Sequence, residues 1–229
     1  MSLPGSRRAI FLLPLLAFAA ACQQPAIASE AVVRAPAAQI GAKESKGLKT
    51  AIFAGGCFWG VEGVFSHMKG VTSAVSGYHG GTKSTADYKA VTAGRSQHAE
   101  AVKVTYDPAI VRYDQLLRVF FSVITDPTQL NRQGPDRGAQ YRSALVPLNS
   151  EQARVASAYL KQLGKADVWG KPIVTRIEKH RAFFPAETYH QDFMLKNPRH
   201  PYIQAWDAPK VSAFQEMYPA WYKSGFTKR

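Results

Sequence analysis

The chain has 229 residues, of which 46% are hydrophobic and 20% are charged, and this length suits a single globular domain with a substantial core. No internal repeat is visible, and no segment after residue 22 is apolar enough to span a membrane, which argues against a repeat architecture and a membrane-spanning domain. The formal net charge of +13 favours an acidic partner or an anionic surface. Because the Lys and Arg residues are dispersed, without a run of four or more, a solvated basic surface is the simpler interpretation.

The N-terminal residues have the pattern of a targeting segment. Arg7 and Arg8 supply positive charge, and residues 9–21 (AIFLLPLLAFAAA) follow as an apolar region that is too short for a transmembrane helix. We therefore expect an exported protein, either free in the periplasm or anchored as an outer-membrane lipoprotein of a bacterium.

Two ends of the targeting segment are compatible with the sequence. Residues 20–22 (AAC) resemble a bacterial lipobox, in which Cys22 would be lipidated and would begin the mature chain. A lipobox cysteine resembles those that receive several acyl chains, as stable anchoring requires. Alternatively, residues 26–28 (AIA) form a small-x-small site, and cleavage there would release a soluble protein that begins at Ser29.

The next segment has a different composition from the rest of the chain. After a signal peptide of residues 1–21, or 1–28, residues 22–47 are rich in Ala, Pro, Ser and Gly and contain no aromatic residue. Such a composition is typical of a flexible tether. We therefore expect the folded domain to cover residues 48–229.

The second cysteine, Cys57, lies where a strand is followed by a helix. Residues 48–54 form a short apolar strand, Gly55 and Gly56 end it, and residues 58–68 have helical spacing. A helix N-terminus favours a thiolate, and an exported protein seldom leaves a cysteine without a disulfide partner unless the thiol is reactive. The residue types alone favour a reactive thiol, with an inert cysteine in an aromatic core as the alternative.

The rest of the chain mixes strands and helices without a regular alternation. Residues 131–140 (NRQGPDRGAQ) are polar and Gly-rich and predict a loop, and the tail after Asn197 looks irregular. The pattern predicts strands at 71–78, 100–106, 141–147 and 173–178, and helices at 113–124, at 150–163 with Ser150 as N-cap, and at 186–195. This order favours an α+β fold with helices packed on a sheet.

Several motifs follow one another between about residue 50 and residue 210. They are Gly56–Gly60 (GCFWG), Gly77-Tyr78 with Gly80-Gly81, His98–Val102 (HAEAV), Gln133–Gly138 (QGPDRG) with Gln140–Ser143 (QYRS), and Ala186-Glu187 with Tyr189–Gln191 (YHQ). In order and spacing they resemble the A-type peptide methionine sulfoxide reductases, enzymes that restore methionine from its sulfoxide. The resemblance implies a two-layer α/β sandwich, a ferredoxin-like plait, with an irregular C-terminal tail.

The resemblance also implies the roles of the residues around the cysteine. Cys57 matches the nucleophile that attacks the sulfur of methionine S-sulfoxide, free or in oxidised proteins, and that becomes a sulfenic acid. Phe58 and Trp59 match the pocket for the substrate methyl group, which has no hydrogen bonds to offer.

Four further residues match the polar part of the family's site. Glu100 matches the acid that protonates the sulfoxide oxygen, because a carboxyl beside an apolar pocket has a raised pKa. Tyr88 and Tyr141 match the tyrosines whose hydroxyl groups bind that oxygen. Asp136 matches the carboxylate that orders water and neighbouring groups.

A metal site is not expected. Glu187 and His190 have a spacing that metal sites use, but no matching set of His and Cys residues accompanies them. His190 is interpreted as a structural histidine.

The chain departs from many members of the family after Cys57. It contains no later cysteine that would resolve the oxidised nucleophile, and the segment after Lys196–Pro198 continues as Pro201–Ile203 (PYI). We therefore expect no bound cofactor, and regeneration by an external thiol, either a small thiol or a glutaredoxin-like or thioredoxin-like donor protein.

Two other functions are weighed against this one. A cysteine hydrolase would use Cys57 with a histidine and would form an acyl-enzyme. A binding module would hold nucleic acid or anionic lipid on its basic, aromatic surface, and its binding would depend steeply on salt.

Overall fold

The computed structural model describes Met1 and residues 32–228. Cys22 and both expected cleavage positions lie outside the described residues. Within residues 32–228, no helix combines the length and the hydropathy needed to cross a membrane.

The protein has one main sheet with helices and turns around it. The main sheet has the order β7-β6-β1-β3-β2-β8, and only β6 and β7 are parallel neighbours. Its strands are β1 (Lys49–Gly55), β2 (Val71–His79), β3 (Ala99–Tyr106), β6 (Ser143–Val146), β7 (Arg176–Ile177) and β8 (Phe183–Pro185). A small hairpin joins β4 (Arg132–Gln133) to β5 (Asp136–Arg137). The helices are α1 (Phe58–Ser66), α2 (Tyr88–Thr92), α3 (Tyr113–Val119), α4 (Ser150–Ala166), α5 (Phe193–Lys196) and α6 (Ala208–Met217). The tighter or wider turns are η1 (Lys83–Thr85), η2 (Phe120–Ile124), η3 (Ala139–Tyr141), η4 (Thr188–His190) and η5 (Ile203–Asp207).

The connections between the four central strands define the fold. Helix α1 joins β1 to β2, α3 lies between β3 and β6, and the two β-α-β units interleave, so that the strands lie in the order β6-β1-β3-β2. Each strand is antiparallel to its neighbours in this group. This is the ferredoxin-like plait, and the expected α+β sandwich is confirmed.

The core lies mainly between the sheet and the helices. On this face the ring of Phe53 from β1 packs against Phe65, Phe120 and Tyr113, with ring centroids 4.9, 5.4 and 6.0 Å away. The opposite face is lined by smaller buried side chains, which pack with Leu148 and Phe183. Glu100 is two positions from the core residue Val102, so its side chain points to the helical face and towards the start of α1.

The C-terminal tail differs from its expected irregular form. It contains η5 and α6, and Phe214 of α6 is fully buried in the core. Pro209 suggests a break in the sequence, yet it lies in the first turn of α6, where its missing N–H has no helical acceptor in any case.

Two other elements are shorter than expected. The helix expected at residues 186–195 is interrupted at Asp192, whose positive φ of 54° separates η4 from α5. The strand expected at residues 173–178 is reduced to the two residues of β7.

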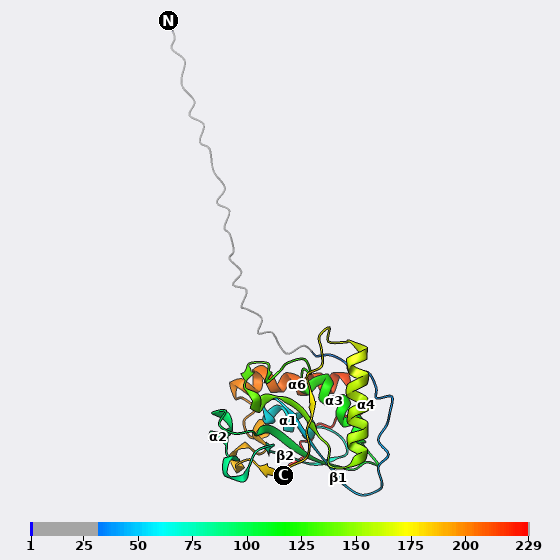
Figure 1. The fold of residues 1–229 in the computed structure, drawn as a ribbon. Helices are drawn as coiled ribbons and strands as arrows, with labels where there is room; N and C mark the ends of the chain where they lie inside the picture. Colours follow the sequence, from blue (N-terminus) through cyan, green and yellow to red (C-terminus); the bar gives the residue numbers. More distant parts are fainter. Residues whose placement is uncertain (2–31, 229) are drawn as a thin grey trace.

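Part of the expected tether is packed against the domain. Residues 33–47 pass alongside α4 (Figure 1), where the Gln39 N–H donates to Gln162 at 2.9 Å. The Ala42 N–H donates to Asp114 at 2.9 Å, and Ala35 is fully buried. The flexible tether is therefore wrong for residues 33–47, because polar groups of α3 and α4 satisfy a backbone whose own composition gives no sign of them.

Glu44 makes the contacts of this segment that are easiest to test. Its carboxylate accepts the Tyr106 hydroxyl at 2.6 Å and the Tyr113 N–H at 3.0 Å. We expect Glu44→Ala to lower the free energy of unfolding by about 1–3 kcal/mol in a urea titration, because two donors lose their acceptor. The neighbouring exposed Lys46 provides the control, and Lys46→Ala should leave the stability unchanged. Equal stability of both variants would mean that the hydrogen bonds of Glu44 do not contribute to the stability of the fold.

Candidate active site

Cys57 lies at the junction between β1 and α1, at the N-cap position of the helix. Gly56, directly before it, has a φ of +99°, and a Cβ at this position would lie 2.7 Å from the Cβ of Gln133. Only glycine fits this backbone conformation and this close approach. The glycine break thus brings the loop that carries Gln133 and Asp136 against the cysteine.

The Cys57 thiol has a pKa well above its ordinary value. Burial is the main cause, and the negative charges of Asp207, Glu100 and Asp136 add to it, whereas the Trp59 backbone N–H opposes it. The N-terminus of α1 favours the thiolate through the Trp59 N–H, but the other contributions to the pKa of the thiol are larger. Burial and three carboxyl groups outweigh the helix N-terminus, and the cysteine is a thiol at neutral pH.

Glu100 is buried beside the same helix N-terminus, with 1% of its surface exposed. Its Oε2 accepts the Phe58 N–H at 3.0 Å, directly next to Cys57 in the chain. Burial raises the pKa of Glu100 to about 8, and the charges of Asp136 and Asp207 add to the effect although the Phe58 N–H opposes it. At neutral pH Glu100 therefore holds a proton that it can donate.

Two tyrosines complete the polar side of the site. Tyr88 begins α2, and Tyr141 ends η3. Burial and the charges of Glu100 and Cys57 raise the pKa of Tyr88 to about 12, and burial with the same two charges raises the pKa of Tyr141 further. Glu100 and Cys57 affect the pKa of both hydroxyl groups, so these four predicted residues lie in one site. At neutral pH both tyrosines keep their hydroxyl protons and can donate hydrogen bonds.

The aromatic residues after Cys57 form the apolar side. Phe58 is buried against Tyr78 and His190. Trp59 stacks on Phe193 with centroids 3.7 Å apart and donates its indole N–H to His190 Nδ1 at 3.1 Å. Burial also lowers the pKa of His190, so this histidine is a neutral support for the tryptophan, in agreement with its structural interpretation.

The site contains two residues that the sequence did not indicate, Tyr202 and Asp207. Tyr202 is the partner of Asp136. Asp136 accepts a short hydrogen bond from the hydroxyl of Tyr202, whose ring meets Trp59 edge-on at 5.9 Å. Asp207 is buried beside Gly60, where a Cβ would lie 2.3 Å from its Oδ1. Both residues come from the tail, and no local pattern marks them, although Tyr202 lies in the segment where a resolving cysteine was sought.

Glu187, the acidic residue of the Glu187–His190 pair, accepts hydrogen bonds from within the protein. Glu187 accepts the Tyr78 hydroxyl at 2.7 Å and the Tyr88 N–H at 2.9 Å, and so fixes the start of α2. Within the part of the chain that the structure describes, no group of three or more His, Cys, Asp or Glu side chains is placed to hold a metal ion.

The site therefore joins a thiol, a protonated carboxyl group and two phenol donors to an aromatic wall. It suits a substrate with a small apolar group beside an electrophilic atom that carries a polar oxygen. The fold and the site define an α+β thiol enzyme.

Known proteins are similar to this chain in sequence and in fold. A family model described as peptide methionine sulfoxide reductase matches residues 49–221. A Mesorhizobium japonicum protein named peptide methionine sulfoxide reductase MsrA 2 is 56% identical over 180 residues, which cover 79% of this chain and 92% of that protein. A Synechocystis protein of the same name is 48% identical over 174 residues, which cover 76% of this chain and 81% of that protein.

Two solved structures agree with this result. Methionine sulfoxide reductase A of Corynebacterium diphtheriae gives a TM-score of 0.62 at 32% identity, over 68% of this chain and 78% of that one. Mxr1 from Saccharomyces cerevisiae in reduced form gives a TM-score of 0.58 at 33% identity, over 71% of this chain and 92% of that one. The chain belongs to the peptide methionine sulfoxide reductase family, whose reaction is the thiol-dependent reduction of methionine sulfoxide.

The charge of Asp207 gives a direct test of the environment of Cys57. Asp207→Asn keeps the size of the side chain and removes one of the charges that raise the pKa of the thiol. We expect the pH at which iodoacetamide alkylation of Cys57 reaches half its maximal rate to move to a lower value. Glu216→Gln removes an exposed acid of α6 and serves as the control. An unchanged midpoint in Asp207→Asn would show that this carboxyl does not act on the thiol.

Proposed function

We propose that this protein reduces the S epimer of methionine sulfoxide, free and in oxidised proteins, to methionine. The observation that carries the proposal is the hydrogen bond from the Phe58 N–H to a buried Glu100 whose pKa is about 8. This bond holds a proton donor beside the thiol of Cys57. Membership of the family supports the same conclusion.

The proposed reaction exchanges an oxygen between two sulfur atoms. The Cys57 sulfur attacks the sulfoxide sulfur as Glu100 gives its proton to the oxygen, and the thiol proton then restores the Glu100 carboxyl group. The attack forms a bond between the two sulfur atoms. That bond and the bond between the oxygen and the substrate sulfur then both break, while the oxygen becomes bonded to the Cys57 sulfur. The products are methionine, reduced by two electrons, and a cysteine sulfenic acid, oxidised by two electrons.

The other residues fix the substrate around the two sulfur atoms. Phe58 and Trp59 enclose the methyl group, and the hydroxyl groups of Tyr88 and Tyr141 donate to the oxygen, whose negative charge grows as the bond to sulfur breaks. Asp136 acts through Tyr202, the partner of its carboxylate, which packs on the edge of Trp59.

The two alternatives gain nothing from the comparisons. The two relatives and the Corynebacterium diphtheriae structure described above are named methionine sulfoxide reductases, and none of these names is that of a hydrolase or a nucleic-acid-binding module. His190, which packs against Phe58 and Trp59, takes the Trp59 N–H on Nδ1.

Export is part of the proposal and rests on the first residues of the sequence. The charged and apolar segments of residues 7–21 support a signal peptide, and Cys22 supports a lipid anchor in a bacterial envelope. Cleavage before Ser29, which would give a soluble periplasmic protein, is the other form.

The regeneration of Cys57 is proposed to depend on an outside thiol. This sequence contains no cysteine after Cys57, and Tyr202 lies against Trp59 in the segment where a resolving cysteine was sought. A glutaredoxin-like protein or a small thiol would attack the sulfenic acid directly, whereas a thioredoxin-like donor would first need a mixed disulfide with Cys57.

The choice of epimer tests the function itself. A pocket with a methyl wall on one side and fixed oxygen donors on the other accepts one hand of a chiral sulfoxide. We expect turnover of methionine S-sulfoxide with dithiothreitol as reductant, and negligible turnover of the R epimer, as measured by chiral chromatography. Equal consumption of both epimers, or of neither, would contradict the proposed function.

The role of Glu100 predicts both a rate and a pH profile. Glu100→Gln keeps the size of the side chain but removes the proton, and we expect the rate to fall by roughly 10²–10⁴, the usual contribution of general acid catalysis. Because the raised pKa keeps Glu100 protonated below about pH 8, kcat/KM of the unmodified enzyme should fall as the pH rises through that value.

Glu62 provides a matched control for this experiment. It is a second buried acid, on α1, and burial raises its pKa to about 8 as well, but it accepts the Asp192 N–H and lies outside the reaction centre. Glu62→Gln should retain the rate and the fall above pH 8. Loss of that fall in Glu62→Gln, or its persistence at full rate in Glu100→Gln, would assign the proton to another group.

A single-turnover reaction tests the regeneration of Cys57. Without reductant, we expect about one methionine per subunit and a gain of one oxygen in the intact mass, with Cys57 labelled by a sulfenic-acid trap. The mass of protein purified from the membrane and soluble fractions, recorded before turnover, also distinguishes lipidated Cys22 from a chain that begins at Ser29. Two methionines per subunit, or a loss of two hydrogens through a disulfide, would overturn the single-cysteine mechanism.

A further inference from the structure

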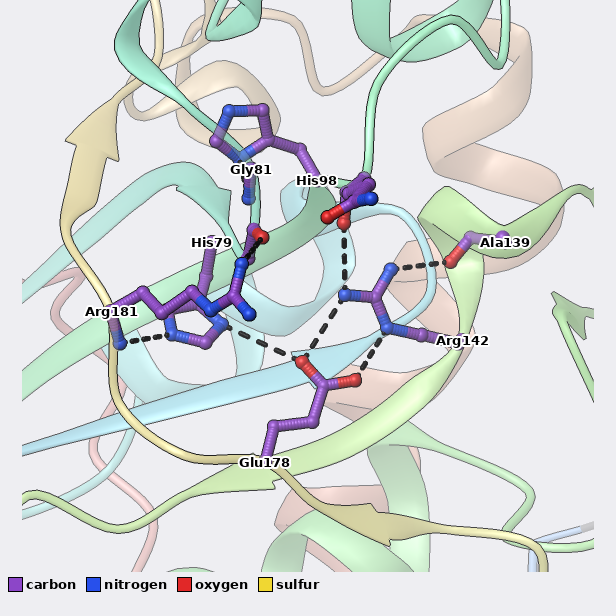
Figure 2. Close-up of polar contacts among 9 residues, drawn as sticks. His79, Gly81, His98, Ala139, Arg142, Glu178 and Arg181 are labelled. Carbon is purple, nitrogen blue, oxygen red and sulfur yellow. Dashed lines mark hydrogen bonds and ion pairs between the residues drawn. The ribbon is translucent and has the colours of Figure 1, made fainter.

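The residue after Tyr141 ties together parts of the chain that are distant in sequence. The guanidinium of Arg142 donates to the Ala139 carbonyl at 2.9 Å and to the Gln97 carbonyl at 3.2 Å (Figure 2). Ala139 begins η3, the turn that ends at Tyr141, and Gln97 lies just before β3, the strand that carries Glu100. One cation therefore holds the tyrosine turn against the strand of the catalytic acid.

A carboxylate holds this guanidinium in place. Glu178 accepts from Arg142 Nε at 2.7 Å and from Nη2 at 3.2 Å, a two-point contact that fixes the plane of the guanidinium. The side chains are only 11% and 21% exposed, so water competes weakly for the pair. The pKa of Glu178 is held at about 2, because the hydrogen bonds and charge of Arg142, with the His79 ring nearby, outweigh its burial. Its backbone N–H donates to the Leu145 carbonyl of β6 at 2.9 Å, which anchors the carboxylate to the sheet.

His79, at the end of β2, lies behind this pair. Its Nε2 accepts the Arg181 N–H at 3.1 Å, so the ring proton is on Nδ1, which faces Glu178 Oε2 at 3.7 Å. The side chain of Arg181 returns to the Gly80 carbonyl at 3.2 Å. Figure 2 shows the Glu178 carboxylate facing both His79 and the Arg142 guanidinium, with the backbone of Arg181 on the other side of the His79 ring.

The Gly80-Gly81 motif belongs to the same arrangement. A Cβ on Gly80, whose φ is +107°, would lie 2.9 Å from Arg142 Nη2, and a Cβ on Gly81 would lie 2.5 Å from the ring of His98. His98 Nδ1 accepts the Gly81 N–H at 3.1 Å. Gly80 therefore lets the loop that leads towards α2 and Tyr88 lie directly on the guanidinium, and Gly81 lets the same loop lie on the ring of His98.

From these contacts we infer that Arg142, held by Glu178, is a positioning residue that fixes the hydroxyl of Tyr141 relative to Glu100. The inference rests on the proposed function, in which Tyr141 donates to the sulfoxide oxygen and Glu100 protonates it. Tyr141 sits on a three-residue turn, which cannot fix a side chain on its own. A donor that stabilises growing charge must already be in place when the charge appears, so a small displacement of η3 acts on the rate more than on binding.

The experiment compares Arg142→Lys with a guanidinium outside the network. Lysine keeps the charge, but its single ammonium cannot hold Glu178 at two points and reach both carbonyls. We expect kcat for methionine S-sulfoxide to fall roughly 10- to 100-fold with little change in KM, the scale of a displaced catalytic group. Arg142 and Glu178 line a surface cavity that the exposed Arg176 lines as well. Arg176→Lys should leave kcat unchanged.

A double-mutant cycle separates positioning from general damage. If Arg142 acts through Tyr141, Arg142→Lys should have little further effect on kcat in the Tyr141→Phe background. Losses that multiply in the double variant, or a normal kcat in Arg142→Lys, would overturn the inference. If Arg142→Lys does not fold, Glu178→Gln takes its place in the experiment. A normal kcat in Glu178→Gln would overturn the inference as well.

The outcomes also distinguish this inference from the proposed function. Tyr141→Phe with a normal kcat would remove Tyr141 from the proposed oxygen site and sink the inference with it, while the epimer and Glu100 experiments report on the reaction independently. A slow Tyr141→Phe combined with an unaffected Arg142→Lys would leave the proposed function intact and defeat the positioning role alone.

Discussion

The hydrogen bond from the Phe58 N–H to Glu100 is the contact on which the site depends. It joins the first turn of α1 to the middle of the sheet, and it can form because β3 turns Glu100 to the helical face next to β1. An N–H at a helix start has no acceptor within its helix, so the carboxyl group satisfies a need of the backbone and is fixed by it. The same bond places the acid next to the cysteine.

In this arrangement Cys57 and Glu100 both keep their protons, whereas an isolated helix N-terminus would favour an anion. Burial raises the pKa of both Cys57 and Glu100, and Asp136 and Asp207 raise them further. The free enzyme thus keeps Cys57 as a thiol, which reacts slowly with the electrophilic reagents that a thiolate attacks. In the proposed reaction the two groups become reactive together, when a sulfoxide supplies both an electrophilic sulfur and a place for the proton.

The residues that the sequence predicted well are those whose chemistry and neighbours lie close together in the chain. The glycine break before Cys57, the aromatic pair after it and the strand with Glu100 all have local patterns, and the ferredoxin-like order of the strands followed from the family resemblance. Tyr202 and Asp207 reach the site through the packing of the tail, and neither Pro201 nor Pro209 suggests a helix nearby. The contacts of Glu44 escaped prediction for the same reason, since its partners lie about sixty to seventy residues further along.

The packed segment of residues 33–47 changes the geometry of an anchored enzyme. If Cys22 carries the lipid, only residues 23–32 separate it from the docked part of the chain, and ten residues extend at most about 35 Å. The full tether that composition suggests would have allowed more than twice that reach. An anchored molecule would therefore repair the layer of proteins closest to the bilayer, and its working radius would be set by the hydrogen bonds of Gln39, Ala42 and Glu44 as much as by the lipid.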